Sequence, residues 1–187
     1  MKKIALIALA ASAAIATPAA AQTVTGTITL TGSVASKCFV APGPGSTFAE
    51  TVAFGELAQT NGTMRTDLAT AFATRSATVV CTTSTPKISV DANPLTAATA
   101  TAATGYDNSI DFLASVAVVT TGANAGPFTN DSAAAAGAAT TIGGGRLANS
   151  ASNINITTSN YRTGNLTDLL AADPSYSGSI VVVISPN

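Results

Sequence analysis

Histidine and tryptophan are absent from the sequence, and only 9% of its 187 residues are charged. Without histidine, the chain has no imidazole for acid–base catalysis, for a Ser-His-Asp triad or for a metal site that uses His. Its 8 Lys and Arg residues are too few to neutralise the phosphates of a nucleic acid. The chain is nevertheless 47% hydrophobic, which is unlike a disordered protein. The composition therefore favours one folded domain that is not an enzyme, needs no cofactor and binds no nucleic acid.

The first 21 residues have the pattern of a signal peptide. Lys2 and Lys3 precede an apolar stretch over 4–15, and three alanines end at position 21, just before Gln22. This stretch is shorter than the roughly 20 apolar residues that a membrane-spanning helix needs, and no later stretch is long enough either. We therefore expect a chain that is exported through the inner membrane, begins at Gln22 after cleavage and contains no transmembrane span.

The sequence has only two cysteines, Cys38 and Cys81. In an oxidising compartment such a pair normally forms a disulfide, and two cysteines without histidine do not make a convincing zinc site. A bridge that closes a loop of this length removes about 4 kcal/mol of unfolded-state entropy in the chain model. We therefore predict a structural disulfide and no metal.

Short stretches rich in Val, Ile and Thr predict β structure throughout the exported chain. Turn-rich segments that contain Gly and Pro separate them, and neither a fixed-period repeat nor a long linker divides the chain. One helical turn is expected over 168–172, before Pro174. The expected fold is a single all-β antiparallel sandwich, with strands over 24–34, 77–81, 87–91, 109–121, 152–158 and 179–184.

Motifs that could indicate catalysis or ligand binding are weak. The glycines at 143–145 precede Arg146, but the Lys-Ser/Thr pair of a P-loop is missing. Asp107 and Asp111 could serve a glycoside hydrolase or bind Ca²⁺, but their spacing does not match an EF-hand loop. The tyrosines and phenylalanines either form the core or line a sugar-binding face. We expect no catalytic residues.

The most unusual feature is the segment that follows the signal peptide. From Val24 to Val34, every even position is apolar or Gly and every odd position is Thr or Ser, and there is no charge before Lys37. Edge strands are normally protected by charge, proline or a bulge, and this segment has none of them. It therefore has the character of a strand that pairs, either with its own sheet or with that of a neighbouring molecule.

Residues 28–40 resemble the beginning of the major subunits of chaperone–usher pili, including spore-coat-U-like relatives. In this family an alternating extension leads into a first strand that carries the first Cys, and the second Cys ends the next core strand. Here 77–81 takes the place of that second strand, and 52–57 is similar to a short Phe-Gly segment between the two. Residues 175–184 resemble the closing strand of the family.

The resemblance implies an immunoglobulin-like, pilin-type β-sandwich that is incomplete because its final strand is missing. It divides the chain into a signal peptide (1–21), a donor-strand extension (22–36) and a pilin-like domain (37–187). A periplasmic chaperone would first fill the groove of each copy. At an outer-membrane usher, copies would then polymerise by donor-strand exchange into an adhesive surface fibre or coat. The donor residues would be Val24, Gly26, Ile28, Leu30 and Gly32, and the acceptor groove would lie along the last strand, Ile180, Val181, Val182, Val183 and Ile184.

One alternative remains open. The chain could be a self-complete exported β-sandwich that binds a glycan or another surface ligand through exposed aromatic side chains. In that case the alternating segment would pair within its own sheet. A secreted enzyme that uses Asp107 and Asp111 is the third and weakest hypothesis.

Overall fold

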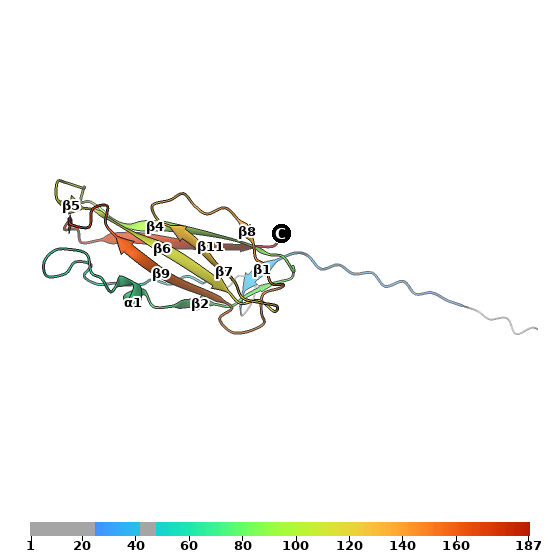
Figure 1. Ribbon diagram of the computed structural model, residues 1–187. Helices are drawn as coiled ribbons and strands as arrows, with labels where there is room; N and C mark the ends of the chain where they lie inside the picture. Colours follow the sequence, from blue (N-terminus) through green and yellow to red (C-terminus); the bar gives the residue numbers. More distant parts are fainter. Residues whose placement is uncertain (1–24, 42–47) are drawn as a thin grey trace, which may run out of the picture. The chain divides into compact units, whose positions relative to one another are not determined.

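A computed structural model describes residues 25–41 and 48–187 (Figure 1). The chain divides into two units, Met1–Ser33 and Val34–Asn187, which are considered separately below. The predicted signal peptide and the predicted donor residue Val24 lie outside the described residues.

In the first unit, residues 25–33 contain no assigned helix or strand. The side chains of Ile28 and Leu30 are 88% and 90% exposed. A Cβ atom added at Gly26 or Gly32 would meet no other atom within 4 Å. The alternating segment was expected to be a strand. It is not one in the isolated chain, because an extended segment becomes part of a sheet only when its N–H and C=O groups find a partner.

The second unit is mostly β, with antiparallel pairing and a single five-residue helix among its described residues. This confirms the all-β class. Within 25–41 and 48–187, the one parallel pair joins β5 and β10. In chain order the elements are β1 (Cys38–Val40), α1 (Leu68–Phe72), β2 (Arg75–Ala77), β3 (Val79–Cys81), β4 (Lys87–Ala97), β5 (Tyr106–Asp107), β6 (Ser109–Val118), β7 (Ala125–Asp131), β8 (Thr140–Thr141), β9 (Ile154–Arg162), β10 (Leu169–Leu170) and β11 (Tyr176–Ser185).

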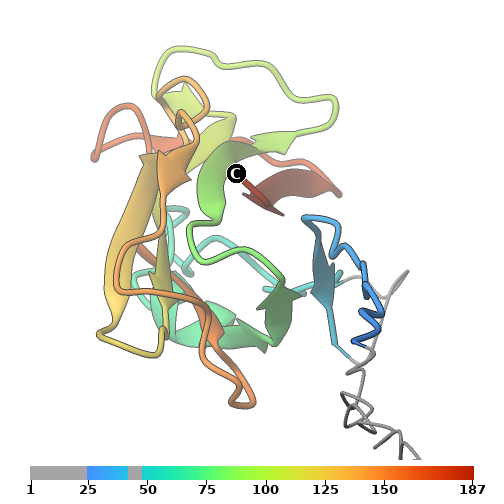
Figure 2. The same cartoon turned by 90° about the vertical axis from the view of Figure 1, so that its right-hand side faces the viewer.

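The largest sheet follows the order β11-β4-β6-β9-β2, and β6 changes partners along its length. Its first two residues pair with the end of β4, whereas the rest of β6 lies between β7 and β9. The small pair β1–β3 stands apart from this order. Viewed along the strands, β1 and β11 are seen on the same side of the unit although they belong to different sheets (Figure 2).

The core lies between β4 on one side and β6 and β9 on the other. Over 87–92 of β4 and throughout β6 the even-numbered residues are buried and alternate with more exposed odd ones, as expected for strands with one face against a core. Cys38 and Val40 of β1 and the even-numbered apolar residues of β11 pack against this cluster from its edge. Its buried members include Ile88, Val90, Ala92, Phe112, Ala114, Val116, Val118, Ile154 and Ile156.

The predicted disulfide between Cys38 and Cys81 is present and spans 43 positions of sequence. The two cysteines are directly opposite each other in the β1–β3 pair. Thr82 extends the contact: its N–H donates to the carbonyl of Lys37, and its hydroxyl accepts from the N–H of Lys37 and donates to the carbonyl of Ala35. Ala35 and Lys37, which precede β1, are thus hydrogen-bonded to the residue that follows β3.

Two local predictions differ from the structure. The helical turn expected over 168–172 is wrong, because Leu169 and Leu170 form β10. Their N–H groups donate to the carbonyls of Gly105 and Gly62, and the side chain of Leu170 is buried in a second apolar cluster. Strand β7 was not predicted, since its Gly126-Pro127 pair is more typical of a turn.

Candidate functional site

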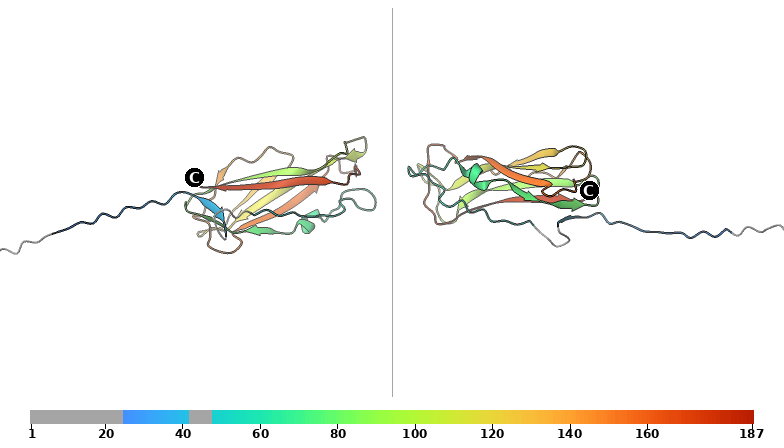
Figure 3. Two further views of the ribbon diagram at one scale, coloured as in Figure 1. Left: turned by 180° about the vertical axis from the view of Figure 1, so that it is seen from behind. Right: turned by 90° about the horizontal axis from the view of Figure 1, so that it is seen from below.

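Strand β11 stands at the end of its sheet, and β4 is its only strand partner among the described residues of 34–187. Seen from behind, it is the nearest strand of the sheet (Figure 3). Gly178 lies where the register shifts, and an added Cβ there would come within 2.7 Å of the carbonyl oxygen of Pro94. Only glycine therefore lets β11 approach β4 this closely. A strand with one unpaired edge can accept a further strand.

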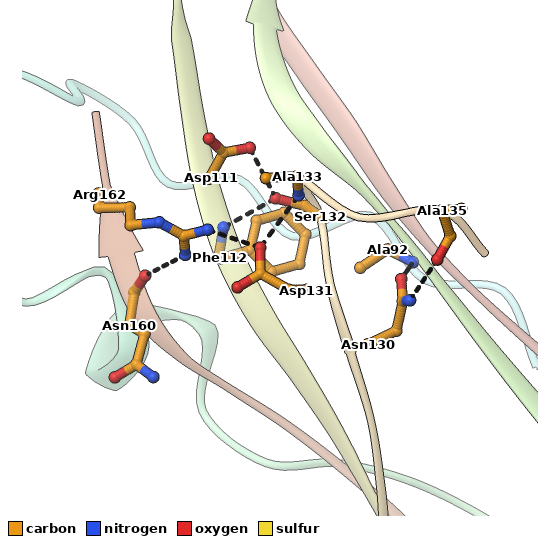
Figure 4. Close-up of polar contacts among 10 residues, drawn as sticks. All are labelled: Ala92, Asp111, Phe112, Asn130, Asp131, Ser132, Ala133, Ala135, Asn160 and Arg162. Atoms are coloured by element: carbon orange, nitrogen blue, oxygen red, sulfur yellow. Dashed lines mark hydrogen bonds and ion pairs between the residues drawn. The ribbon is translucent and has the colours of Figure 1, made fainter. Parts of the chain in front are cut away.

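Hydrogen bonds of β4 determine which backbone groups of β11 point to the unpaired edge. The N–H of Ala92 donates to the side chain of Asn130 at 2.8 Å (Figure 4). The carbonyl of Val90 accepts from the N–H of Gly137, so the backbone groups of both residues point away from β11. The residues opposite them in the register are Ile180 and Val182. In an antiparallel pair, opposite residues either bond to each other or both point away. The N–H and C=O groups of Ile180, Val182 and, by the same alternation, Ile184 therefore face the unpaired edge.

A second unpaired backbone lies across from β11, in the extended segment 48–57. Val52 and Phe54 pack against the core and alternate with exposed residues, which is the period of a strand. None of the backbone N–H groups of 48–57 donates to another described residue. Its backbone hydrogen bonds are made through carbonyls: the side chain of Arg65 donates to those of Phe54 and Glu56, and the N–H of Arg65 donates to that of Leu57. This segment has the shape of a strand but no strand partner.

Between these two backbones lies a groove of about 1260 Å³, called the β11 groove below. One wall is formed by 48–58 and the other by 170–180. Phe112, Ile156 and Tyr161 contribute to its floor. The Tyr161 ring stacks on the Phe112 ring with 5.5 Å between ring centroids, and it meets the Phe54 ring edge-on with 6.1 Å between centroids. The aromatic rings therefore contact one another. The floor is therefore mainly apolar and is shaped to receive apolar side chains.

Few charges surround the groove. Glu50 and Arg75 pair across 3.4 Å at its rim. Burial raises the pKa of the Tyr161 phenol, whose hydroxyl donates to Thr158. The pKa of Asp173 is lowered and the pKa of Tyr176, like that of Tyr161, is raised, so none of these three shifts is toward neutrality. No group of three or more His, Cys, Asp or Glu residues among the described residues could hold a metal. Charged side chains are thus a minority of the groove lining.

One end of the groove is organised by Asp173. Its carboxylate accepts hydrogen bonds from the hydroxyl and N–H of Thr99, from the N–H of Ala100 and from the N–H of Ser175. The Thr99 hydroxyl and these N–H groups hold the pKa of Asp173 well below its usual value. Nearby, Tyr176 donates its hydroxyl to the carbonyl of Ala171 at 2.7 Å. These bonds fix the turn from which β11 begins.

We predict that this turn weakens in acid. The folded protein stabilises the ionised form of Asp173. The contribution of Asp173 to the free energy of unfolding is therefore complete above the ordinary carboxyl pKa. It is lost as the pH falls from that value toward the lower pKa of the folded state. Thermal unfolding followed from about pH 5 to pH 2 should show a steeper loss of Tm for the wild type than for Asp173→Asn. Equal slopes for the two proteins would show that Asp173 does not stabilise the turn.

The structure separates the predicted acceptor residues into two sets. Ile180, Val182 and Ile184 pack against the core, and Ile180 also lines the β11 groove. Val181 and Val183 lie on the opposite, exposed face of the strand. The predicted donor residues Gly26, Ile28, Leu30 and Gly32 all lie in the extended N-terminal segment. The place of segment 48–57 in the groove wall was not predicted, although Val52 and Phe54 have the period-2 spacing of a strand.

The weaker candidates lie elsewhere. Asp111 accepts a hydrogen bond from the Ser132 hydroxyl at 3.1 Å, beside an ion pair of 2.6 Å between Arg162 and Asp131 (Figure 4). Asp107 accepts from the N–H of Asn165. Both carboxylates thus have partners in loops and strand ends. The glycines at 143–145 lie in a loop between β8 and β9 that does not begin a helix.

Comparisons with protein-family models, with curated proteins and with solved structures each give no match. Among the described residues, no helix has both the length and the apolar character required to cross a membrane.

Proposed function

We propose that this protein is the structural subunit of a surface fibre or coat, and that it polymerises when the N-terminal segment 22–36 of one copy enters the β11 groove of another. The observation that carries this proposal is the apolar groove between segment 48–58 and residues 170–180, from which the unpaired edge of β11 continues to Ile184. The same chain has an exposed, uncharged segment with the period of a strand.

The segment and the groove complement each other. An inserted strand could bond on one side to the N–H and C=O groups of Ile180, Val182 and Ile184, and on the other to 48–57. Its even positions, Ile28 and Leu30 among them, would point to the apolar floor, and its threonines would remain in solvent. Burial of each large apolar side chain would contribute about 1.5–3 kcal/mol.

This proposal includes the finer assignment of the fold as an immunoglobulin-like sandwich of the pilin type that lacks its last strand. It also includes a periplasmic chaperone that occupies the groove before assembly, an outer-membrane usher, and a final location at the cell surface. The Cys38–Cys81 disulfide is in keeping with an oxidising compartment outside the cytoplasm. No catalytic residue and no cofactor are part of the proposal.

The alternative of a glycan-binding, self-complete sandwich has less support. Sugar-binding sites need aromatic faces that are free to stack on a ring. Phe112, Phe54 and Tyr161 in the groove use their rings to contact one another. Tyr106, which is exposed, lies in the two-residue strand β5 away from the groove lining.

Adding the segment as a separate peptide tests the proposal. A chain from which 22–32 is deleted should bind a synthetic peptide of residues 22–33 with one-to-one stoichiometry, measured by fluorescence anisotropy. A peptide of the same composition in which the apolar residues are adjacent and no longer alternate should bind at least about a hundredfold more weakly, because no register could place all of its apolar side chains on the floor. Equal binding of the two peptides, or rescue of the truncated chain only by a covalently attached segment, would contradict donation between molecules.

A further inference from the structure

The outer face of β11 and β4 is a second surface, separate from the groove. Over 87–91 of β4 and 181–185 of β11 the odd-numbered residues face outward, since the even ones pack against the core. In the register, Val181 is opposite Asp91, Val183 is opposite Ser89, and Ser185 is opposite Lys87. Val181 and Val183 are 47% and 51% exposed. In the view from behind, no other strand is drawn over β11 (Figure 3).

Lys87 and Asp91 are the charged residues of this face. They lie four positions apart on β4, roughly 13 Å in an extended strand, and are therefore too far apart to pair with each other. Neither forms an ion pair with any residue in the described ranges 25–41 and 48–187. The face thus presents one positive and one negative charge at equal distances on either side of Ser89.

We propose that this outer face binds the same face of a second copy, about a two-fold axis that passes over Ser89 and Val183. Such an axis places position 87 of one copy over position 91 of the other. Lys87 then meets Asp91 twice, and Val183 meets Val183 at the centre. An interface in which the same patch serves on both sides is the usual arrangement of a symmetric dimer. The spacing of the two charges makes the face complementary to itself.

The contact is small, since it involves one face of two strands and not the roughly 800 Å² per partner of a standard interface. We therefore expect a weak dimer that is seen at high protein concentration. The face lies beside the unpaired edge of β11 and does not include it, so a strand in the groove leaves it free. If the proposed function also holds, weak contacts repeated along two fibres would add up and join the fibres laterally.

A charge-exchange experiment tests the dimer. Sedimentation equilibrium of the chain from Gln22 would compare the wild type with Lys87→Glu, Asp91→Lys and the double variant. Each single variant creates like-charge contacts and should weaken the dimer about tenfold. The double variant restores opposite charges across the axis and should recover most of the affinity. A double variant no tighter than the single ones, or a chain that stays monomeric at all concentrations, would overturn the proposal.

The same series is also measured with Ile28→Lys, which blocks the donor segment. Loss of long multimers in that background reports on the proposed function, whereas the charge-exchange pattern reports on the two-fold face. The two failures are thereby distinguishable. If the double variant recovers the dimer in both backgrounds, the face acts independently of the groove.

A cysteine at the axis gives an independent geometric test. Stacked sheets lie about 10 Å apart, which is too far for a disulfide, so the thiols are joined with a short bismaleimide, each maleimide of which adds one Val183→Cys thiol. We expect rapid covalent dimerisation for Val183→Cys and about tenfold slower dimerisation for the control Val181→Cys, which faces Ser185 of the second copy. Equal rates for the two variants would contradict the position of the axis.

Discussion

Replacement of Ile28 with lysine should abolish end-to-end assembly while the monomer is still exported and folded. Ile28 is exposed in the isolated chain, so the substitution removes no contact from its own domain. In the β11 groove, however, the lysine would place a charge against an apolar floor and would lose the burial energy of isoleucine. We expect donor affinity to fall at least about a hundredfold, with multimers measured by size-exclusion chromatography and electron microscopy.

A matched control comes from the adjacent position. Thr27→Lys adds the same charge to the same segment, but at an odd position that would face solvent after insertion. Multimers should persist in Thr27→Lys. If both variants assemble equally well, or both fail, the alternation of the segment has no role in assembly and the donor proposal is wrong.

Removal of the disulfide should produce the second large effect. Changing both Cys38 and Cys81 to alanine releases a loop of 43 positions and should lower the free energy of unfolding by about 4 kcal/mol in the chain-entropy model. Urea unfolding measures this difference. Because β1 is only three residues long and packs at the edge of the core, we also expect the variant to accept donor peptide more weakly.

Reduction provides the control for this prediction. A reducing agent should destabilise the wild type to the level of the double variant and leave the variant itself unchanged. A wild type that keeps its full stability after both thiols have been shown to be free would contradict the assigned role of the bridge.

The sequence predicted several of the strands whose partners lie within the domain, but not β7. The candidate strands at 109–121 and 179–184 correspond to β6 and β11 because one face of each packs on the core. Strand β4 extends past its predicted end at 91, through Pro94, because a register shift against β11 accommodates the proline. Such a shift depends on the partner strand and is not encoded in the local pattern.

The site was less predictable than the fold. The cysteine pair and the unprotected N-terminal segment follow from residue types alone. The direction in which the backbone groups of Ile180 and Val182 point, by contrast, depends on bonds that Asn130 and Gly137 make to the other edge of β4. Those residues are about 40 positions or more away in sequence. Segment 48–57 has strand periodicity without a strand partner, so pattern reasoning could not give it a role.

Residue-resolved hydrogen exchange of β11 tests the central claim most directly. In the monomer, the amides of Val181 and Val183 bond to β4 and should exchange slowly, whereas those of Ile180, Val182 and Ile184 face the unpaired edge and should exchange quickly. Assembly, or addition of the 22–33 peptide, should slow the exchange of these three amides selectively. If the three amides are already protected in the monomer, or remain fast in the assembled fibre, no strand is donated to the groove and the account fails.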